Sequence, residues 1–191
     1  ATLARLEAGA SVRACHIDQR HLDMLISRTP EVLCNKLSTS IQKLPDASLA
    51  ENYYGAILCS RVFHFLTGDE IDESLANMYR WLKPGGKLYL IADTPFGIWR
   101  KFIPVWEANH ARNERWPGYM EPLIDFLPYQ SNGASKGPPF MNLMSPELLS
   151  RACEEAGFKK LRADWISRED FHGSGKMDGR ENCGIVAIKP E

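Results

Sequence analysis

Asp18 is the first side chain in this sequence whose type and position suggest chemistry. It ends a stretch, SVRACHID, in which apolar and polar residues alternate as they do in a half-buried strand. In an open α/β sheet, ligands bind at the carboxyl ends of the strands, and a carboxylate there can accept hydrogen bonds from the hydroxyls of a ribose. An aspartate in this position can equally cap a following helix, so both roles are open at this point.

Two histidines are candidates for a general base, because an imidazole titrates near neutral pH. His64 lies in an aromatic stretch, FHF, and the alternative is a packed or loop residue. His110 lies in EANHARNER, and the alternative is a solvated helix residue. His16, Asp18 and His21 could also be read as metal ligands. However, alternate strand positions followed by a helix do not surround a tetrahedral ion, so we expect no metal site.

The patterns that carry these side chains alternate between strand and helix through residue 93. We expect the run at 53–60 to be a central strand covered on both faces, because it is apolar throughout. Such alternation predicts a doubly wound, mostly parallel sheet of the α/β class. The predicted strands are 11–17, 32–37, 53–60 and 87–93, and the predicted helices are 1–8, 19–29 and 69–83.

The C-terminal part predicts a helix and two further strands. Ser145 and Pro146 form a helix start, with a capping hydroxyl followed by a proline in the first position, and the helix runs to Gly157. Strands are predicted at about 158–166 and 182–189. Because the loop of about 15 residues between them shows no helical pattern, we expect an antiparallel hairpin at the edge of the sheet.

Composition excludes several classes of protein. The chain has 191 residues, of which 44% are hydrophobic and 25% charged, as in an ordinary globular domain. Its net charge of -1 gives no electrostatic reason to bind nucleic acid or an anionic membrane. We find no apolar run long enough to span a membrane and no signal-peptide pattern. The five cysteines are odd in number and far apart, which favours buried free thiols in a reducing compartment and a cytoplasmic protein.

Residues 94–140 differ from the rest of the chain, because they hold seven of the 12 prolines and nine of the 19 aromatic residues. An aromatic-rich segment of this kind is typical of a cap over a pocket or of an interface. We predict a cap that recognises a mid-sized, partly apolar metabolite; the alternative is a homodimer surface. The side chains expected to form this lid are Trp99, Trp106, Trp116 and Tyr119.

Three blocks of the sequence resemble a known family. CHIDQRHLDML, LPDASLAENYYGAILCSRVFHFL and RWLKPGGKLYLIAD are similar, in order and spacing, to the later motifs of class I S-adenosylmethionine-dependent methyltransferases, in the type 11/12 small-molecule branch. The LKPGG turn at 82–86 is the most specific piece. The resemblance covers about residues 1–93, with 145–190 similar at the level of a Rossmann-like fold.

The resemblance implies roles for the matched residues. Asp18 and the adjacent Gln19 would bind the cofactor, with Asp18 on the ribose. Ser40 and Ile41 would flank the adenine; the family often has an aspartate where Ser40 stands. The methionine end of S-adenosylmethionine would lie against a segment that ends the strand at 53–60, namely Ser60, Arg61 and Val62.

One motif of the family is missing from the printed sequence. ATLARLEAGASV resembles the helix that follows the family's glycine-rich loop, so we expect that loop, and the first strand before it, to lie upstream of Ala1. The expected organisation is a cofactor-binding part (1–93), an aromatic and proline-rich cap insertion (94–140), and a helix with edge strands of the same domain (141–191).

The resemblance to this family implies transfer of a methyl group from S-adenosylmethionine to a small molecule, with S-adenosylhomocysteine as the other product. Two alternatives stand beside it. A nicotinamide-dependent oxidoreductase would also use an acid after the second strand, but the C-terminal hairpin and the LKPGG turn fit a methyltransferase better. A catalytically inactive methyltransferase-like scaffold is favoured by Ser40 and by the missing glycine loop. Binding of the cofactor separates the scaffold from the enzyme.

Overall fold

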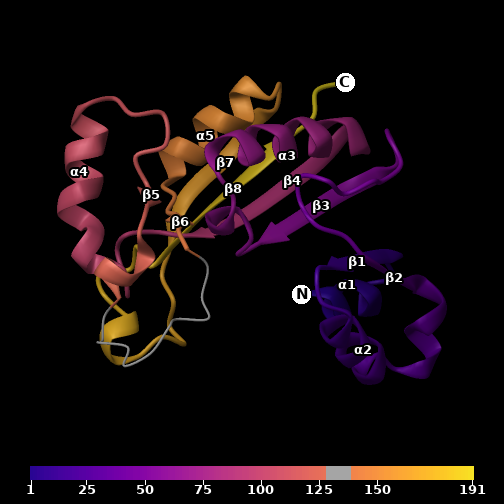
Figure 1. Ribbon diagram of the computed structural model, residues 1–191. Helices are drawn as coiled ribbons and strands as arrows, with labels where there is room; N and C mark the ends of the chain where they lie inside the picture. Colours follow the sequence, from indigo (N-terminus) through magenta and orange to yellow (C-terminus); the bar gives the residue numbers. More distant parts are fainter. Residues whose placement is uncertain (128–138) are drawn as a thin grey trace. The chain divides into compact units, whose positions relative to one another are not determined.

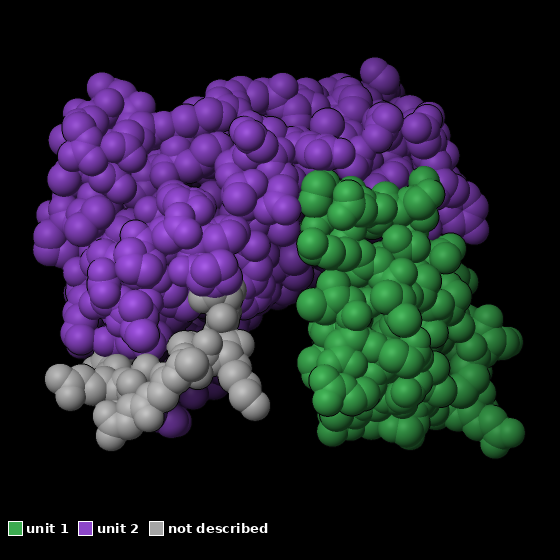
Figure 2. Space-filling view, viewed as in Figure 1, with its two compact units in different colours: residues 1–49 green, residues 50–191 purple. Residues whose placement is uncertain are grey.

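The computed structural model describes residues 1–127 and 139–191, and the chain forms two compact units, residues 1–49 and 50–191 (Figures 1 and 2). This division follows the contacts within the chain. The expected division into 1–93, 94–140 and 141–191 was made by the role of each segment, and it stays a prediction. Residues 128–138 of the expected cap lie outside the described residues.

Unit 1, residues 1–49, is a pair of parallel strands with connecting helices. Strands β1 and β2 pair in parallel, and His16 lies opposite Ile41 at their carboxyl ends. The strand predicted at 11–17 and the helices predicted at 1–8 and 19–29 are confirmed. The elements are α1 (Thr2–Glu7), β1 (Val12–His16), α2 (Gln19–Arg28), the 3-10 helix η1 (Glu31–Lys36) and β2 (Leu37–Ile41).

The strand predicted at 32–37 is wrong. That segment forms η1, and strand β2 begins only at Leu37. Pro30 precedes the turn with φ -54°, and its carbonyl accepts the backbone N–H of Leu33 at 2.8 Å. The fixed φ of proline suits the start of a helical turn. This preference of Pro30 for a turn outweighs the short apolar run at 32–37, from which the strand was predicted.

Unit 2, residues 50–191, is built on a four-stranded mixed sheet in the order β3-β4-β8-β7. Strands β3 and β4 are parallel, whereas β8 is antiparallel to both β4 and β7. The α/β class and the antiparallel C-terminal hairpin are therefore confirmed, while the missing first strand stays a prediction. The strands are β3 (Tyr54–Ser60), β4 (Leu82–Asp93), β7 (Lys159–Ile166) and β8 (Asn182–Ile188).

Helices α3 (Gly68–Trp81) and α5 (Pro146–Glu155) lie along the same side of this sheet (Figure 1). Their apolar residues recur at helical spacing, so each helix presents one face to the core, where Leu75, Leu88 and Leu149 are almost completely buried. Both helices begin with side-chain caps. Thr67 and Glu70 form a reciprocal capping box at α3, and the Ser145 hydroxyl accepts the N–H of Leu148 at α5.

The LKPGG turn, residues 82–86, lies within the first part of β4, directly after α3. Strand β4 begins at Leu82, earlier than predicted, and its pairing with β3 shifts between Leu82 and Lys87. Gly85 has φ +74°, in the left-handed region where a Cβ is unfavourable. The turn therefore needs glycine for its backbone conformation.

The expectation that residues 53–60 are covered on both faces is wrong. In the described part of unit 2, β3 is the edge strand of its sheet and pairs with β4. Cys59 is buried, but Leu58 next to it is 48% exposed. A strand with one partner and one covered face leaves alternate side chains exposed, whatever their hydrophobicity.

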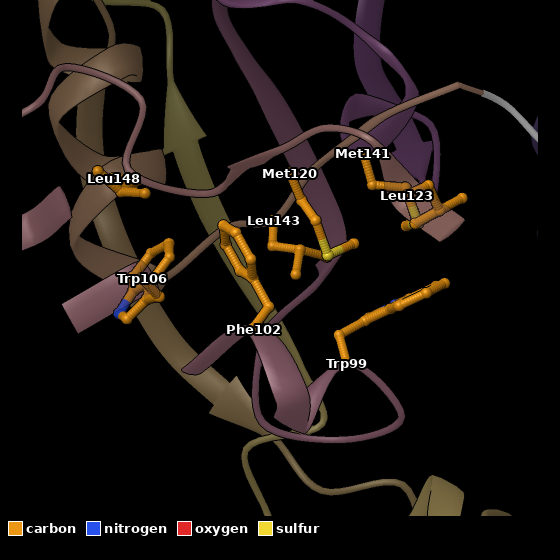
Figure 3. Packing of buried hydrophobic residues seen from close by; sticks show 8 residues of the cluster. All are labelled: Trp99, Phe102, Trp106, Met120, Leu123, Met141, Leu143 and Leu148. Atoms are coloured by element: carbon orange, nitrogen blue, oxygen red, sulfur yellow. The ribbon is translucent and has the colours of Figure 1, made fainter. Parts of the chain in front are cut away.

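The segment after β4 builds a hydrophobic cluster of its own (Figure 3). In this view Phe102, Leu143 and Met120 lie between Trp106 and Trp99. Leu148 on α5 packs into the same cluster. The segment is therefore part of the folded core of unit 2. Its elements are the 3-10 helices η3 (Arg100–Phe102) and η4 (Leu123–Phe126), the helix α4 (Ile103–Ala111), and the paired strands β5 (Tyr119–Met120) and β6 (Met141–Asn142).

The cysteines are all free thiols, but they are not all buried as expected. Cys59, Cys153 and Cys183 are buried, whereas Cys15 and Cys34 are exposed. The two exposed thiols lie in unit 1, whose short strands and turn leave most side chains partly open. Among the described helices, none has the length and apolar character needed to cross a membrane.

Candidate functional site

Asp18 lies directly after β1 and caps helix α2. Its carboxylate accepts the backbone N–H of Arg20 at 2.9 Å and also pairs with the guanidinium of Arg20. These hydrogen bonds, first from the side chain and then from the backbone of Arg20, lower the pKa of Asp18 well below its ordinary value. The carboxyl is therefore a carboxylate at neutral pH, as a partner for hydroxyl donors must be.

Unit 1 brings four of the predicted cofactor residues to one edge. Asp18 and Gln19 follow β1, while Ser40 and Ile41 end the neighbouring strand β2. Ile41 is 58% exposed. The Ser40 hydroxyl accepts a hydrogen bond from Arg13 Nε at 3.3 Å, and Gln19 donates to Asp23 at 2.7 Å. An anionic group and an exposed apolar side chain thus lie at neighbouring strand ends.

His16 and His21 form a hydrogen-bonded pair beside Asp18. His16 Nδ1 accepts the backbone N–H of Asp18 at 2.9 Å, and His16 Nε2 lies 3.0 Å from His21 Nδ1. His16 Nδ1 also lies 3.2 Å from the carbonyl oxygen of Asp18, and the tautomers of the two rings decide which nitrogen donates in the His16–His21 contact. No group of three or more metal-ligating side chains occurs among residues 1–127 and 139–191.

Unit 2 places the second set of predicted residues at the end of β3. Ser60 and Val62 are exposed, and Arg61 lies between them with φ +59°. The left-handed conformation is costly for a residue with a side chain and marks sites whose geometry the surroundings impose. Here the backbone N–H of Arg61 donates to Ile91 on β4 at 2.7 Å, which holds this conformation.

The Arg61 side chain reaches Asp93, the last residue of β4. Arg61 Nε lies 3.2 Å from Asp93 Oδ1, and Asn182 on β8 donates to the same oxygen at 2.7 Å. Asn182 in turn accepts from Arg168 at 2.8 Å. The ends of β3, β4 and β8 are therefore joined through one buried carboxylate.

A cavity of about 280 Å³ opens beside this carboxylate. Arg61 and Asp93 form part of its wall, and the other lining residues come from the segment 94–99, which ends in Trp99, and from the loop that contains Phe171 and Glu181. Arg61 is the predicted cofactor residue that this wall contains. Asp93 was missed by the sequence reasoning, although it ends the apolar run KLYLIAD in the same way that Asp18 ends its own strand.

His64 is buried, with 1% of its surface exposed. Its Nδ1 accepts the backbone N–H of Asp93 at 3.3 Å, and its ring packs edge-on against Phe65. Burial lowers the pKa of His64; the nearby Asp93 carboxylate opposes this and Arg61 adds to it. The ring is neutral at pH 7, and its acceptor nitrogen is already in use.

His110 is exposed on helix α4 and lines a second cavity, of about 420 Å³. Trp106, Phe96 and Arg180 share this wall, and the Arg180 guanidinium lies over the Phe96 ring at 3.6 Å from its centroid. Unit 2 therefore does not bring the two candidate bases together, because His64 is buried near Asp93 and His110 lines the other cavity.

The four side chains expected to form a lid lie in different surroundings. Trp99 and Trp106 are buried in the hydrophobic cluster. Trp116 is half-buried, and the guanidinium groups of Arg115 and Arg151 lie 5.5 and 5.7 Å from its ring centroid. Tyr119 is 36% exposed and donates to Glu121 at 2.8 Å.

Residues 1–90 match the model of a family described as a methyltransferase domain. No curated protein shows significant similarity to the sequence. Several solved structures share the fold. A SAM-dependent methyltransferase from Methanosarcina mazei has a TM-score of 0.70 and 16% identity, over 99% of this chain and 86% of its own.

Two further structures have the same fold. The glycopeptide N-methyltransferase MtfA has a TM-score of 0.61 and 16% identity, over 99% of this chain and 78% of its own. The Burkholderia thailandensis 1,6-didemethyltoxoflavin-N1-methyltransferase has a TM-score of 0.64 and 14% identity, over 100% and 66%. The predicted resemblance to class I S-adenosylmethionine-dependent methyltransferases is thus confirmed: the chain has their fold, and residues 1–90 have the sequence pattern of a methyltransferase domain.

Proposed function

We propose that this chain binds S-adenosylmethionine and transfers its methyl group to a small, partly apolar metabolite. The observation that carries the proposal is that the segment matching a methyltransferase domain, residues 1–90, places Asp18 and Ile41 at neighbouring ends of parallel strands. The related MtfA has been solved with S-adenosylmethionine and with S-adenosylhomocysteine, and the Burkholderia enzyme with S-adenosylhomocysteine and 1,6-didemethyltoxoflavin.

The donors and acceptors of unit 1 suit an adenosine. A carboxylate accepts hydrogen bonds from ribose hydroxyls, and an exposed isoleucine can pack against a flat purine. Arg20 now occupies the Asp18 oxygens, but its side chain is 87% exposed. Because exposed ion pairs are screened by water and contribute little to stability, ribose hydroxyls can replace this partner at little cost.

In unit 2, Ser60, Arg61 and Val62 are proposed to face the methionine end. Bound S-adenosylmethionine supplies an activated methyl group on a sulfonium, so the residues of this chain mainly have to hold the acceptor in line and exclude water. Arg61 suits a carboxylate ligand, because a guanidinium donates several hydrogen bonds in one plane. The Arg61 side chain is 47% exposed, which leaves part of it accessible.

The aromatic segment after β4 is proposed to form the acceptor-binding wall. Its buried tryptophans hold the shape of the wall, while Trp116 and Tyr119 are the more exposed members. His110 suits the role of base better than His64, because His64 is buried and its acceptor nitrogen is bonded. The cytoplasmic location and the homodimer stay predictions from the sequence.

The test is calorimetric titration of S-adenosylhomocysteine into the full chain and into three variants. Asp18→Asn keeps a good helix cap but removes the charge, so we expect binding to weaken by about 1–3 kcal/mol. Arg20→Gln frees Asp18 and should bind at least as tightly as the original chain. Glu7→Gln removes an exposed charge at the end of α1 in the same unit and should leave binding unchanged. Equal affinity of all four proteins would place the ligand elsewhere.

The alternative is a catalytically inactive, methyltransferase-like binding protein. It is favoured by Ser40, whose hydroxyl is already engaged by Arg13. The same titration, run also on a chain extended upstream to include the expected glycine-rich loop, decides between the two: absence of binding by the extended chain would contradict the enzyme and leave the binding protein.

A further inference from the structure

The second cavity of unit 2 is lined by helix α4, by the loop between β7 and β8, and by Phe96. Its volume of about 420 Å³ falls within the roughly 300–1,000 Å³ typical of sites for small organic ligands. Most of the wall is apolar, which favours a ligand with an apolar body. The apolar lining residues are Phe96, Ile103, Trp106, Ala111 and Met177.

Arg180 is the guanidinium of this wall, and its charge is already paired. It donates to the Asp178 carboxylate at 3.0 and 2.6 Å and stacks on the Phe96 ring, 3.6 Å from the ring centroid. Because the carboxylate compensates the guanidinium at short range, the pair neither attracts an anion strongly nor repels a cation strongly. Arg180 therefore mainly shapes the wall.

Glu107 is the carboxylate of this wall, and its charge is not paired. Its side chain is exposed on α4 and makes no hydrogen bond or ion pair with a described residue. Hydrogen bonds to Asp178 raise the pKa of Arg180, and the Glu107 carboxylate adds to this through space, which places it within electrostatic reach of the opposite wall. With Arg180 compensated by Asp178, one carboxylate remains in excess, and it attracts a cation.

His110 lies one helical turn after Glu107 and lines the same cavity. Residues three apart lie on one face of a helix. The His110 ring lies 6.3 Å from the Trp106 ring, between their centroids, and its nitrogens have no hydrogen-bond partner in the described part of the chain. An imidazole can take up a proton near neutral pH. The cavity therefore holds a carboxylate that can bind an ammonium ion and a base that can accept its proton.

The cavity adjoins the one of about 280 Å³ through two pairs of consecutive residues. Phe96 lines the first cavity and Gly97 the other, and the same is true of Arg180 and Glu181. Arg61, which is proposed to bind the carboxylate of the methionine end, lines the smaller cavity. The two cavities are thus neighbours within unit 2.

We propose that the cavity lined by α4 binds the methyl acceptor, and that this acceptor is an amine with an apolar body, held as an ammonium ion by Glu107. In the transfer, the ammonium ion gives one proton to His110. The nitrogen lone pair then forms a bond to the methyl carbon of S-adenosylmethionine, while the bond from that carbon to sulfur breaks and leaves its electron pair on sulfur. The role of the amine as acceptor rests on the proposed function, whereas the amine-binding site itself does not.

The test compares three probes that share a benzyl group and differ in charge. Benzylamine is a cation at pH 7, as aliphatic amines are, benzyl alcohol is neutral, and phenylacetate is an anion. Affinities for the full chain are measured by calorimetry. We expect benzylamine to bind saturably, benzyl alcohol to bind at least about threefold more weakly, and phenylacetate to bind more weakly still.

The site of binding is read from Met177, which is 42% exposed and lines the cavity. The chain is labelled with ¹³C at its methionine methyl groups, and the Met177 signal is assigned with Met177→Leu. Benzylamine should shift this signal with the same affinity that calorimetry gives. The signal of Met24, which is 46% exposed in unit 1, should not shift.

Two matched variants test the charge. Glu107→Gln keeps the shape of the side chain, so it should lower the affinity for benzylamine to that for benzyl alcohol and leave benzyl alcohol unchanged. Glu73→Gln removes an exposed carboxylate from α3 and should change nothing. Equal binding of the three probes, an unshifted Met177 signal, or an unchanged preference for benzylamine in Glu107→Gln overturns the proposal.

Titration of S-adenosylhomocysteine into the chain extended upstream separates the two proposals. Binding of S-adenosylhomocysteine without binding of benzylamine leaves the proposed function and overturns the amine site. Binding of benzylamine without binding of S-adenosylhomocysteine contradicts the methyltransferase, and with it the role of the amine as methyl acceptor.

Discussion

The two units both contain parallel strands, yet they bury apolar side chains to different extents. Within unit 1, all of which is described, Leu6 and Leu22 are the buried hydrophobic side chains, while Ile41 and Val32 are exposed, Val32 by 81%. Unit 2 has a core between helices and sheet and the cluster around Phe102. Unit 1 is therefore held mainly by its strand pairing and by the Asp18 cap of α2, and a ligand that covers Ile41 would add burial that this unit lacks.

The largest effect is expected from Phe102→Ala in unit 2. Phe102 is 1% exposed at the centre of the cluster, so truncation should cost about 3–5 kcal/mol of unfolding free energy. Urea unfolding measures this loss. Phe65→Ala is the matched control, because Phe65 is about half exposed, and it should cost about 1 kcal/mol or less. Equal losses would show that the cluster adds little to unit 2.

A smaller effect, dependent on pH, is expected from His64. Burial lowers the pKa of His64 in the folded chain, whereas in the unfolded chain it is about 6.5. As the pH falls from 7 to 5.5, the unfolded state binds more protons, so the folded chain loses stability, with a slope of at most about 1.4 kcal/mol per pH unit from this group.

His64→Asn tests that sign. Asparagine can accept the Asp93 N–H as His64 Nδ1 does but cannot take up a proton. Urea unfolding between pH 5.5 and 7 should therefore show a flatter pH dependence for the variant. An unchanged slope would assign the effect to other groups.

The smallest effect is expected from Val32→Ala in unit 1. Because Val32 is largely exposed, its truncation should change the unfolding free energy by no more than about 0.5 kcal/mol. Thermal unfolding of the variant measures this. A loss above 1 kcal/mol would mean that Val32 is covered in solution, and the contrast between the two units would have to be revised.

The sequence was most informative where one residue determines local structure. Ser145 with Pro146 predicted the start of α5, because capping acts over a few residues. The glycines of LKPGG predicted a turn before a strand at 87–93; Gly85 does have the left-handed backbone of a turn, but the turn lies inside β4, which begins at Leu82. The 3-10 helix η1 was misread, since a short apolar run does not distinguish a turn from a strand.

The candidate site in unit 2 depends on contacts that sequence patterns do not carry. Asp93 and Asn182 are 89 residues apart and meet because β8 runs antiparallel beside β4. The composition of the aromatic segment predicted a cap or an interface. It did not show that Trp99 packs into a cluster while its N–H has no partner among the described residues. Asp18 could be predicted, because its signal is a single acid at a strand end.

The left-handed backbone at Arg61 has a consequence for attempts to improve this chain. A non-glycine residue in that region costs about 1–3 kcal/mol, and glycine would relieve most of it. Selection for heat resistance alone would therefore favour glycine at position 61 and discard the guanidinium that reaches Asp93. A sequence optimised for folding and one optimised for ligand recognition would therefore have different residues at position 61.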